Sequence, residues 1–451
     1  MRAPLLVAAR PDGAADPQSV PSPLDSVLFY GVFGLLLFGP LAFGAVEPWS
    51  MFFMEAGSAA LFVVWAVRQA TSGELRIYGN PAFAPMLVFA CLVAVQILGH
   101  RTSYRYETLS SAWLYCAYGL LCFLAVQCLR KTSQLRMLGR IVCLYGFGVA
   151  LFALLQGVDP NGKLYWMRTP RLGGWVYGPY VNHNHYAGLM EMLMPIPLVV
   201  ALSSAVQGPR KKIAAVAAAV MAVTIFLSGS RGGMLAFAVQ MAVLGTVLIR
   251  RRKSRAMALT LGAFLALMLG LLAWLGGGQL SERLASIHTE ARTELSGGTR
   301  MEINRDGVAM FKLKPVLGWG LGTFATVYPH YRSFYTEFFI NEAHDDYVQL
   351  LVEMGALGMI TMLWLLGVCY YRAIRKLHDW SKEPNGLVAL AAMLGITGIL
   401  VHSFVDFNLQ VPANAALFYV LCTLAAMKPR FAPFRQTRVR RGSEISRALS
   451  A

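Results

Sequence analysis

Residues 250–275 read RRRKSRAMALTLGAFLALMLGLLAWL, a burst of basic side chains followed by an apolar run that contains no charge. An α-helix crosses the hydrocarbon core of a bilayer with about 20 mostly apolar residues. Lys and Arg collect at the cytoplasmic ends of such helices. The stretch therefore predicts a transmembrane helix over 256–275 that starts at the cytoplasmic surface.

Similar apolar runs recur along most of the 451-residue chain. They predict an all-α integral membrane protein of about 12 transmembrane helices, with one large extracytoplasmic loop that contains short helices. The helices are expected at 26–44, 50–69, 82–98, 109–129, 137–156, 185–206, 213–228, 233–249, 256–275, 346–371, 386–404 and 411–427.

The composition excludes two other classes of protein. Hydrophobic residues make up 56% of the chain and charged residues only 14%, with a mean hydropathy of +0.52. A soluble domain carries about 25% charged residues. The net charge of +17 would suit a nucleic-acid binder if the basic residues gathered on one polar surface. Instead they lie in short bursts between apolar runs, as membrane topology requires.

The basic bursts also predict the orientation and the segments of the chain. A cytoplasmic N-terminus places every short basic turn inside the cell. The segments are then a cytoplasmic tail at 1–25, transmembrane helices 1–9 within 26–275, a periplasmic loop at 276–345, helices 10–12 within 346–427 and a basic cytoplasmic tail at 428–451. Both termini are expected in the cytoplasm, and the functional side chains on the opposite face.

No metal site or cofactor is predicted. The seven cysteines fall inside apolar segments or at their edges and show no CxxC spacing. His183 and His185 are two residues apart, but no HExxH motif, cysteine partner or well-spaced carboxylate accompanies them.

Two arginines are candidates for binding an anion. Arg231 lies in the turn Ser228-Gly229-Ser230-Arg231-Gly232-Gly233 between two apolar helices, where an arginine is by default a functional candidate. The alternative is a side chain that only reaches toward the membrane surface. Arg300 lies in the long loop, with Arg305 as its main rival. The planar guanidinium donates two parallel hydrogen bonds, which suits a phosphate.

His344 is the candidate general base. It lies where the long loop turns into a helix, beside Asp345. The positive end of a helix dipole favours the neutral imidazole, which is the form that accepts a proton. Asp345 could orient the ring or raise its pKa. The alternative role of His344 is that of a polar residue capping the helix.

Further polar residues are candidates for binding substrate. Asn182, Asn184 and His185 enter the helix expected at 185–206, and their side chains could hydrogen-bond a sugar or a phosphate. His402 and Asp406 follow near the end of the helix expected at 386–404. For these two, a satisfied structural role is the favoured alternative.

Together these stretches resemble the O-antigen ligase and polysaccharide polymerase family of bacterial membrane glycosyltransferases. The resemblance covers about residues 175–425 and rests on the order and spacing of its motifs. The motifs are Asn182-His183-Asn184-x-x-Ala187-Gly188, Ser230-Arg231-Gly232-Gly233, the Arg300 segment with Lys314-Pro315-Val316-Leu317-Gly318-Trp319-Gly320-Leu321-Gly322, Ala343-His344-Asp345-Asp346-x-x-Gln349-Leu350-x-x-Glu353-x-Gly355, and His402-x-x-x-Asp406-x-x-x-x-x-Pro412.

The resemblance implies a fold like that of the GT-C glycosyltransferases, in the bacterial inner membrane, with a periplasmic active site. It implies transfer, without a metal, of a glycan from undecaprenyl diphosphate to a sugar hydroxyl of lipid A core or of another lipid-linked glycan. Arg231 and Arg300 would bind the diphosphate, and His344 would take the acceptor proton. The chain departs from the family where Asp345, instead of the frequent Asn, follows the histidine. His183 has no role that the resemblance assigns.

Three functions remain open. The ligase is favoured slightly over a polymerase of the same family, and neither is separated from the other by the sequence. A transporter of lipid-linked glycans is the alternative of another class. Transporters commonly show inverted repeats and broken helices around a midplane site. Here the two halves do not pair, and the polar residues gather at one face.

Overall fold

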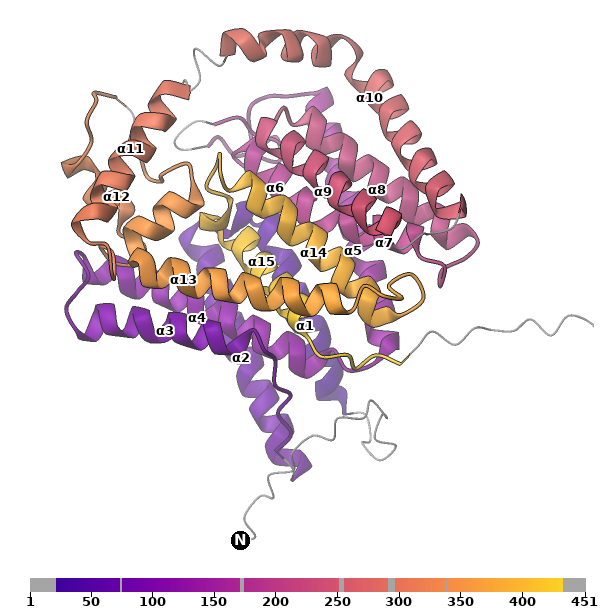
Figure 1. Ribbon diagram of the computed structural model, residues 1–451, viewed down its shortest axis with the longest axis horizontal. Coiled ribbons are helices and arrows are strands. Elements are labelled where there is room, and N and C mark those ends of the chain that lie inside the picture. Colours follow the sequence, from indigo (N-terminus) through magenta and orange to yellow (C-terminus); the bar gives the residue numbers. More distant parts are fainter. Residues whose placement is uncertain are drawn as a thin grey trace, which may run out of the picture.

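The protein is described by a computed structural model, shown in Figure 1, which covers residues 22–73, 75–170, 174–250, 255–290, 297–337 and 339–432. Side chains at 277–290 and 297–298 lie outside this description. The described residues form helices and no strand, with isolated β-bridges only at Leu164–Arg168 and Tyr177–Tyr180. The predicted all-α fold is confirmed.

The helices follow one another along the chain with short connections. Their bounds are α1 Pro23–Leu41, α2 Pro48–Ser72, α3 Phe83–Leu98, α4 Arg105–Cys128, α5 Thr132–Val158, α6 His183–Leu193, α7 Pro195–Leu202, α8 Pro209–Leu227, α9 Arg231–Arg250, α10 Arg255–Glu290, α11 Gly297–Leu313, α12 Phe324–Val327, α13 Asp346–Arg375, α14 Pro384–His402 and α15 Pro412–Ala426, with 3-10 turns η1 Phe43–Ala45, η2 Tyr328–His330 and η3 Asn408–Gln410.

Every predicted apolar run coincides with helix. Within the described ranges, nine helical segments are long and apolar enough to cross a membrane, counting α6 and α7 as one. The helices α3 and α15 are apolar but shorter, with 16 and 15 residues. The helix α8 begins with the basic run at 209–212, which lowers its hydropathy. The count of about 12 therefore consists of these nine together with three shorter or more basic helices.

The structure changes one predicted helix end and does not describe most of the predicted tails. The helix α10 continues to Glu290, past the predicted end at 275, so part of the expected long loop is helical. In Figure 1, α10 and α11 pass along one edge of the bundle. Most of the predicted tails, 1–21 and 433–451, and the basic residues 251–254 lie outside the described residues. The assignment of segments to the cytoplasm or periplasm stays a prediction.

The centre of the bundle is formed by α6, α14 and α15. The helix α14 packs against α9, α15, α6 and α7, and Figure 1 shows it in the middle of the bundle. Almost every side chain of α15 is buried. A helix surrounded on all sides by other helices is apolar all round, as α14 and α15 largely are.

The loop before α12 is fixed on a break in α13. The backbone leaves the helical conformation at Gly355 (φ 64°, ψ −166°), which L-amino acids with a side chain rarely adopt. The freed carbonyls of α13 accept bonds from the loop, from Trp319 N to Val352 O at 2.9 Å and from Gly320 N to Glu353 O at 3.0 Å. The glycine-rich stretch at 318–322 is thus a tight turn against a helix, as its sequence context indicates.

Candidate active site

The site is built around residues 402–407, which end α14 and lead into η3. We call this segment the 402–407 turn. Helices α6, α9, α11 and α13 each contribute a residue that contacts it or lies beside it. Four of the polar residues singled out in the sequence make a polar contact within this region, namely Arg300, His185, His402 and Asp406.

Arg300 reaches the turn from α11. Its Nη1 donates a hydrogen bond to the carbonyl oxygen of Val405 at 3.0 Å. Its Nε is buried and has no hydrogen-bond partner among the described residues. A guanidinium has five N–H donors, so one carbonyl leaves most of them free for an anion.

Arg231 is the first residue of α9, and its side chain is exposed. The next residue, Gly232, lies against the 402–407 turn, because a Cβ built on it would be 2.8 Å from Cγ2 of Val405. Val405 therefore contacts the start of α9 through its side chain and Arg300 through its carbonyl. The two arginines belong to helix starts that meet at one residue.

His344 lies immediately before α13, next to the same turn. Its ring meets the Phe407 ring edge-on, with centroids 4.8 Å apart, and its Nδ1 is buried without a partner among the described residues. Its backbone has a φ of 55°, in the left-handed region. Such a conformation in a residue other than glycine is strained and is common at functional sites.

The imidazole of His344 is neutral at physiological pH. Burial lowers its pKa to about 4, opposed by the carboxylate of Asp406 and assisted by the charge of Arg300. The charge of Arg300 acts on this ring because its guanidinium lies at the same turn. A neutral imidazole is the form that can accept a proton.

His185 and Asp406 also lie beside Phe407. His185 meets the Phe407 ring edge-on at 4.7 Å, and its Nε2 lies 3.7 Å from Oδ1 of Asp406. Burial alone would raise the pKa of Asp406, but the imidazoles of His185, His402 and His344 hold it well below its usual range. Asp406 is therefore a carboxylate surrounded by histidines.

Two candidates, Asn182 and Asp345, have contacts that explain them as local structural residues. Asn182 caps α6 by accepting from Asn184 N at 2.8 Å. Asp345 caps α13 by accepting from Tyr347 N at 2.9 Å and Val348 N at 3.1 Å. The cap of α13 is thus Asp345, and His344 is free of that role.

Two further candidates differ from the group at the turn. Arg305 is exposed on α11, and no described polar contact joins it to the 402–407 turn. His402 is almost fully buried, and both of its ring nitrogens are occupied, Nδ1 by Glu191 and Nε2 by Ser230. A substrate has no free nitrogen on this ring to bind.

The sequence assigned no role to Glu191 or Phe407, nor to Ser230 beyond its place in the Ser230-Arg231-Gly232-Gly233 motif. Glu191 is a single carboxylate within an apolar helix, which is itself a signal, because an ionisable residue in a transmembrane segment marks a functional site by default. Ser230 and Phe407 carry no such signal, since a serine in a turn and an aromatic residue near a helix end are common. Within the described residues, no group of three or more His, Cys, Asp or Glu side chains is arranged to hold a metal ion.

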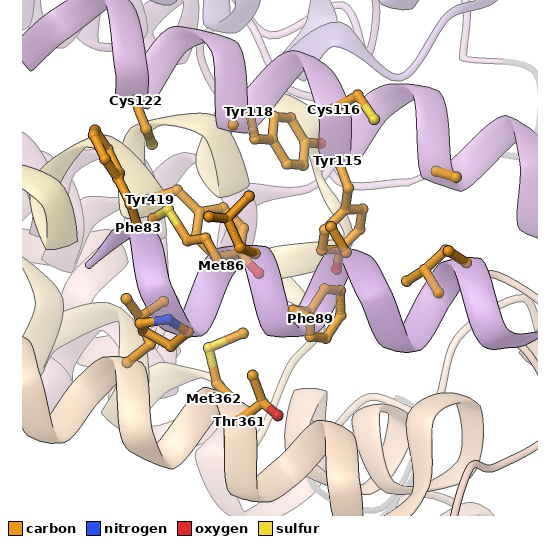
Figure 2. Close-up of a pocket in the computed structure, with 18 of the residues that line it drawn as sticks. Phe83, Met86, Phe89, Tyr115, Cys116, Tyr118, Cys122, Thr361, Met362 and Tyr419 are labelled. Atoms are coloured by element: carbon orange, nitrogen blue, oxygen red, sulfur yellow. The ribbon is translucent and has the colours of Figure 1, made fainter. Parts of the chain in front are cut away.

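An apolar pocket lies apart from these polar residues, between α3, α4 and α13 (Figure 2). Its volume is about 560 Å³, and Phe89, Tyr115, Met362 and Tyr419 are among the side chains that line it. None of the candidate site residues contributes to its wall. The lining suits hydrocarbon and offers little to a sugar or a phosphate.

Comparison with known proteins agrees with the motifs. A family model described as O-antigen ligase matches residues 216–363, a range that contains Arg231, Arg300 and His344. A search of curated proteins finds no match. The matched range is narrower than the region of resemblance in the sequence, but it includes the three residues that carry the proposed chemistry. This match over part of the chain supports the resemblance to the O-antigen ligase and polymerase family.

Proposed function

We propose that this protein transfers a glycan from undecaprenyl diphosphate to a sugar hydroxyl of lipid A core, at the periplasmic face of the inner membrane and without a metal. The match of residues 216–363 to the O-antigen ligase family model supports an O-antigen ligase or polymerase type of function in general. The donor, the acceptor, the side of the membrane and the roles of the residues are the proposal.

The observation that carries the proposal is the meeting of Arg300, the start of α9 and His344 around one turn. Arg300 bonds Val405, Gly232 lies against Val405, and His344 contacts Phe407 two residues later. A diphosphate held by the two guanidinium groups would bring its attached sugar next to the imidazole. Positioning of this kind supplies much of the acceleration in enzymes that have a good leaving group already bound.

The reaction needs one base and a stabilised leaving group. The acceptor hydroxyl oxygen attacks the anomeric carbon of the donor sugar, and its proton moves to His344. The bond between the anomeric carbon and the phosphate oxygen breaks, and undecaprenyl diphosphate leaves with the electron pair. Arg300 and Arg231 stabilise the charge that develops on that oxygen.

Donor binding would also prepare the base. The charge of Arg300 is one of the causes that lower the pKa of His344. A bound diphosphate would offset that charge and would itself favour the imidazolium. The imidazole would therefore become more basic once the donor is in place, which is when a proton must be accepted.

The experiment that tests the proposal uses purified protein, undecaprenyl-diphosphate glycan and a chelator, with lipid A core offered as the acceptor. The product is analysed by gel and by mass. We expect glycan attached to lipid A core. A ladder of longer lipid-linked chains would instead identify the polymerase of the same family. If no acceptor yields a product, the proposed transfer is wrong.

A further inference from the structure

Glu191, His402 and Ser230 form a chain of buried hydrogen bonds beside the start of α9. Oε1 of Glu191 lies 2.8 Å from Nδ1 of His402, and Nε2 of the same ring lies 3.3 Å from Oγ of Ser230. The exposed fractions of these side chains are 0%, 1% and 0%. Buried polar groups linked in this way fix the elements that carry them.

The three residues come from three different parts of the fold. Glu191 belongs to α6, His402 ends α14, and Ser230 immediately precedes α9. Farther along α9, Gln240 donates to the carbonyl oxygens of Glu191 at 2.8 Å and Leu394 at 2.9 Å. The Glu191–His402–Ser230 hydrogen bonds attach the start of α9 to α6 and α14, and Gln240 attaches α9 to the same two helices farther along.

Two glycines allow α9 to approach this closely. A Cβ at Gly232 would lie 2.6 Å from Nε2 of His402, and a Cβ at Gly233 would lie 3.1 Å from Oε1 of Glu191. The first of these distances is shorter than side chains tolerate. The motif Ser230-Arg231-Gly232-Gly233 therefore combines a hydroxyl that bonds His402 with two residues that leave room for the ring and the carboxylate.

The donors and acceptors of Glu191, His402 and Ser230 can all be paired in one arrangement. Oγ of Ser230 accepts from Gly233 N at 3.1 Å, as an N-cap residue does, and can donate its own proton to Nε2 of His402. The ring then donates from Nδ1 to the carboxylate of Glu191. In this arrangement the carboxylate orients the ring, and the ring orients the serine.

None of the three side chains is accessible to a glycan or a lipid diphosphate, yet the residue after Ser230 is Arg231. We infer that the Glu191–His402–Ser230 chain is a positioning device, which holds the first turn of α9 so that Arg231 faces the same diphosphate as Arg300. This inference rests on the proposed function of Arg231. It assigns the three residues no direct contact with substrate.

The expected effect is on donor binding. A hydrogen bond to a charged or capping group that sets the position of a binding side chain contributes enough to change affinity about tenfold when it is lost. Ser230→Ala removes only the link to α9 and leaves the pair of Glu191 and His402 intact. Ser230→Thr keeps a hydroxyl at the cap and should restore most of the affinity.

The test is a double-mutant cycle read by the Kd of undecaprenyl diphosphate in detergent solution. Ser230→Ala and His402→Gln are each made in the wild-type protein and in Arg231→Ala. Ser203→Ala is the matched control, because that buried serine also joins two elements, donating to Ser381 O at 2.8 Å, at the far end of α6 and α7. Thermal midpoints confirm that each variant is folded. If His402→Gln does not fold, Ser230→Ala alone is sufficient for the test.

Non-additive effects support the inference. Both substitutions should weaken binding about tenfold in the wild type and less than twofold in Arg231→Ala. An equal loss in both backgrounds, or no loss in the wild type, overturns the positioning role. The binding cycle tests only the positioning role. The proposed function is tested by glycan transfer, and it is wrong if the wild-type protein transfers no glycan.

Discussion

Arg300 donates from Nη1 to the carbonyl oxygen of Val405 at 3.0 Å, which joins the start of α11 to the turn that follows α14. These residues are far apart in the sequence, and the bond brings a guanidinium to the turn that carries Phe407, against which His344 and His185 pack. The bond uses one donor of Arg300 and leaves its Nε free among the described residues. Arg300 is therefore held in place and still able to bind an anion.

Replacement of Arg300 should mainly reduce transfer. Arg300→Ala should lower kcat by about 10²–10³-fold, the usual loss for one donor that stabilises developing negative charge. Arg300→Lys should recover only part of the activity, because an ammonium group cannot form the bidentate fork. Steady-state transfer assays measure both. Arg305 lies on the same helix but is exposed, so Arg305→Ala should keep kcat within about twofold of the wild type. A loss as large as that of Arg300→Ala would indicate that Arg305 also binds the diphosphate.

The acid limb of the pH profile of kcat/KM should lie at an unusually low pH. Because burial lowers the pKa of His344 to about 4, the imidazole of the free enzyme stays neutral down to that pH. The value of kcat/KM should therefore fall only as the pH drops through about 4, whereas an ordinary histidine would titrate near 6.5. His185→Asn removes a neighbour that helps to lower this pKa, so the limb should move slightly toward neutral pH and still be present. Loss of the limb in His185→Asn would indicate that His185 is the base.

Glu342 should make the protein less stable as the pH rises. Burial and the neighbouring Glu353 raise the pKa of Glu342 to about 8, above its value of 4.5 in an unfolded chain. The folded state therefore retains a proton that the unfolded state has lost between these values, so the contribution of Glu342 to stability is fully present below about pH 4.5 and is lost as the pH rises through about 8.

The measurement is the thermal midpoint between pH 5 and 8. We expect a fall of several degrees in the wild type and a flatter profile in Glu342→Gln. Glu337→Gln, an exposed glutamate of the same segment, serves as the control and should follow the wild type. If Glu342→Gln shows the same fall as the wild type, the carboxyl responsible lies elsewhere.

Gly232→Ala should weaken donor binding without unfolding the bundle. The added Cβ would lie 2.6 Å from Nε2 of His402, so the first turn of α9 must move away from the ring. We expect the Kd of undecaprenyl diphosphate to rise about tenfold. Gly245→Ala in the same helix is the control, since a Cβ there has nothing within 4 Å and binding should be unchanged. Equal Kd values for the two variants would contradict the close-approach argument.

The helices could be predicted from the sequence because a membrane span is a property of one continuous segment. Runs such as 256–275 can be recognised by their length and their lack of charged residues. The break between α6 and α7 at Pro195 and the departure at Gly355 in α13 were not predicted, since both depend on what packs against the helix. The extent of α10 was missed because its last turns are polar.

The candidate site was predictable as a set of residues but not as an arrangement. Arg300 could not be told from Arg305 in the sequence, and the difference is that helical geometry points the two side chains in different directions. A structural role was favoured for His402, but its partner Glu191 went unnoticed, because their pairing joins α14 to α6 across the bundle. The contact between His344 and Phe407 likewise exists only once α13 and the 402–407 turn are packed together.

The most direct test of the account is His344→Ala, measured both by single-turnover glycan transfer and by binding of undecaprenyl diphosphate. The account predicts that transfer falls by at least about 10²-fold, the usual contribution of a general base, while the Kd for the lipid diphosphate stays within about twofold. Transfer at the wild-type rate, with the imidazole removed and binding intact, would contradict the claim that this ring accepts the acceptor proton.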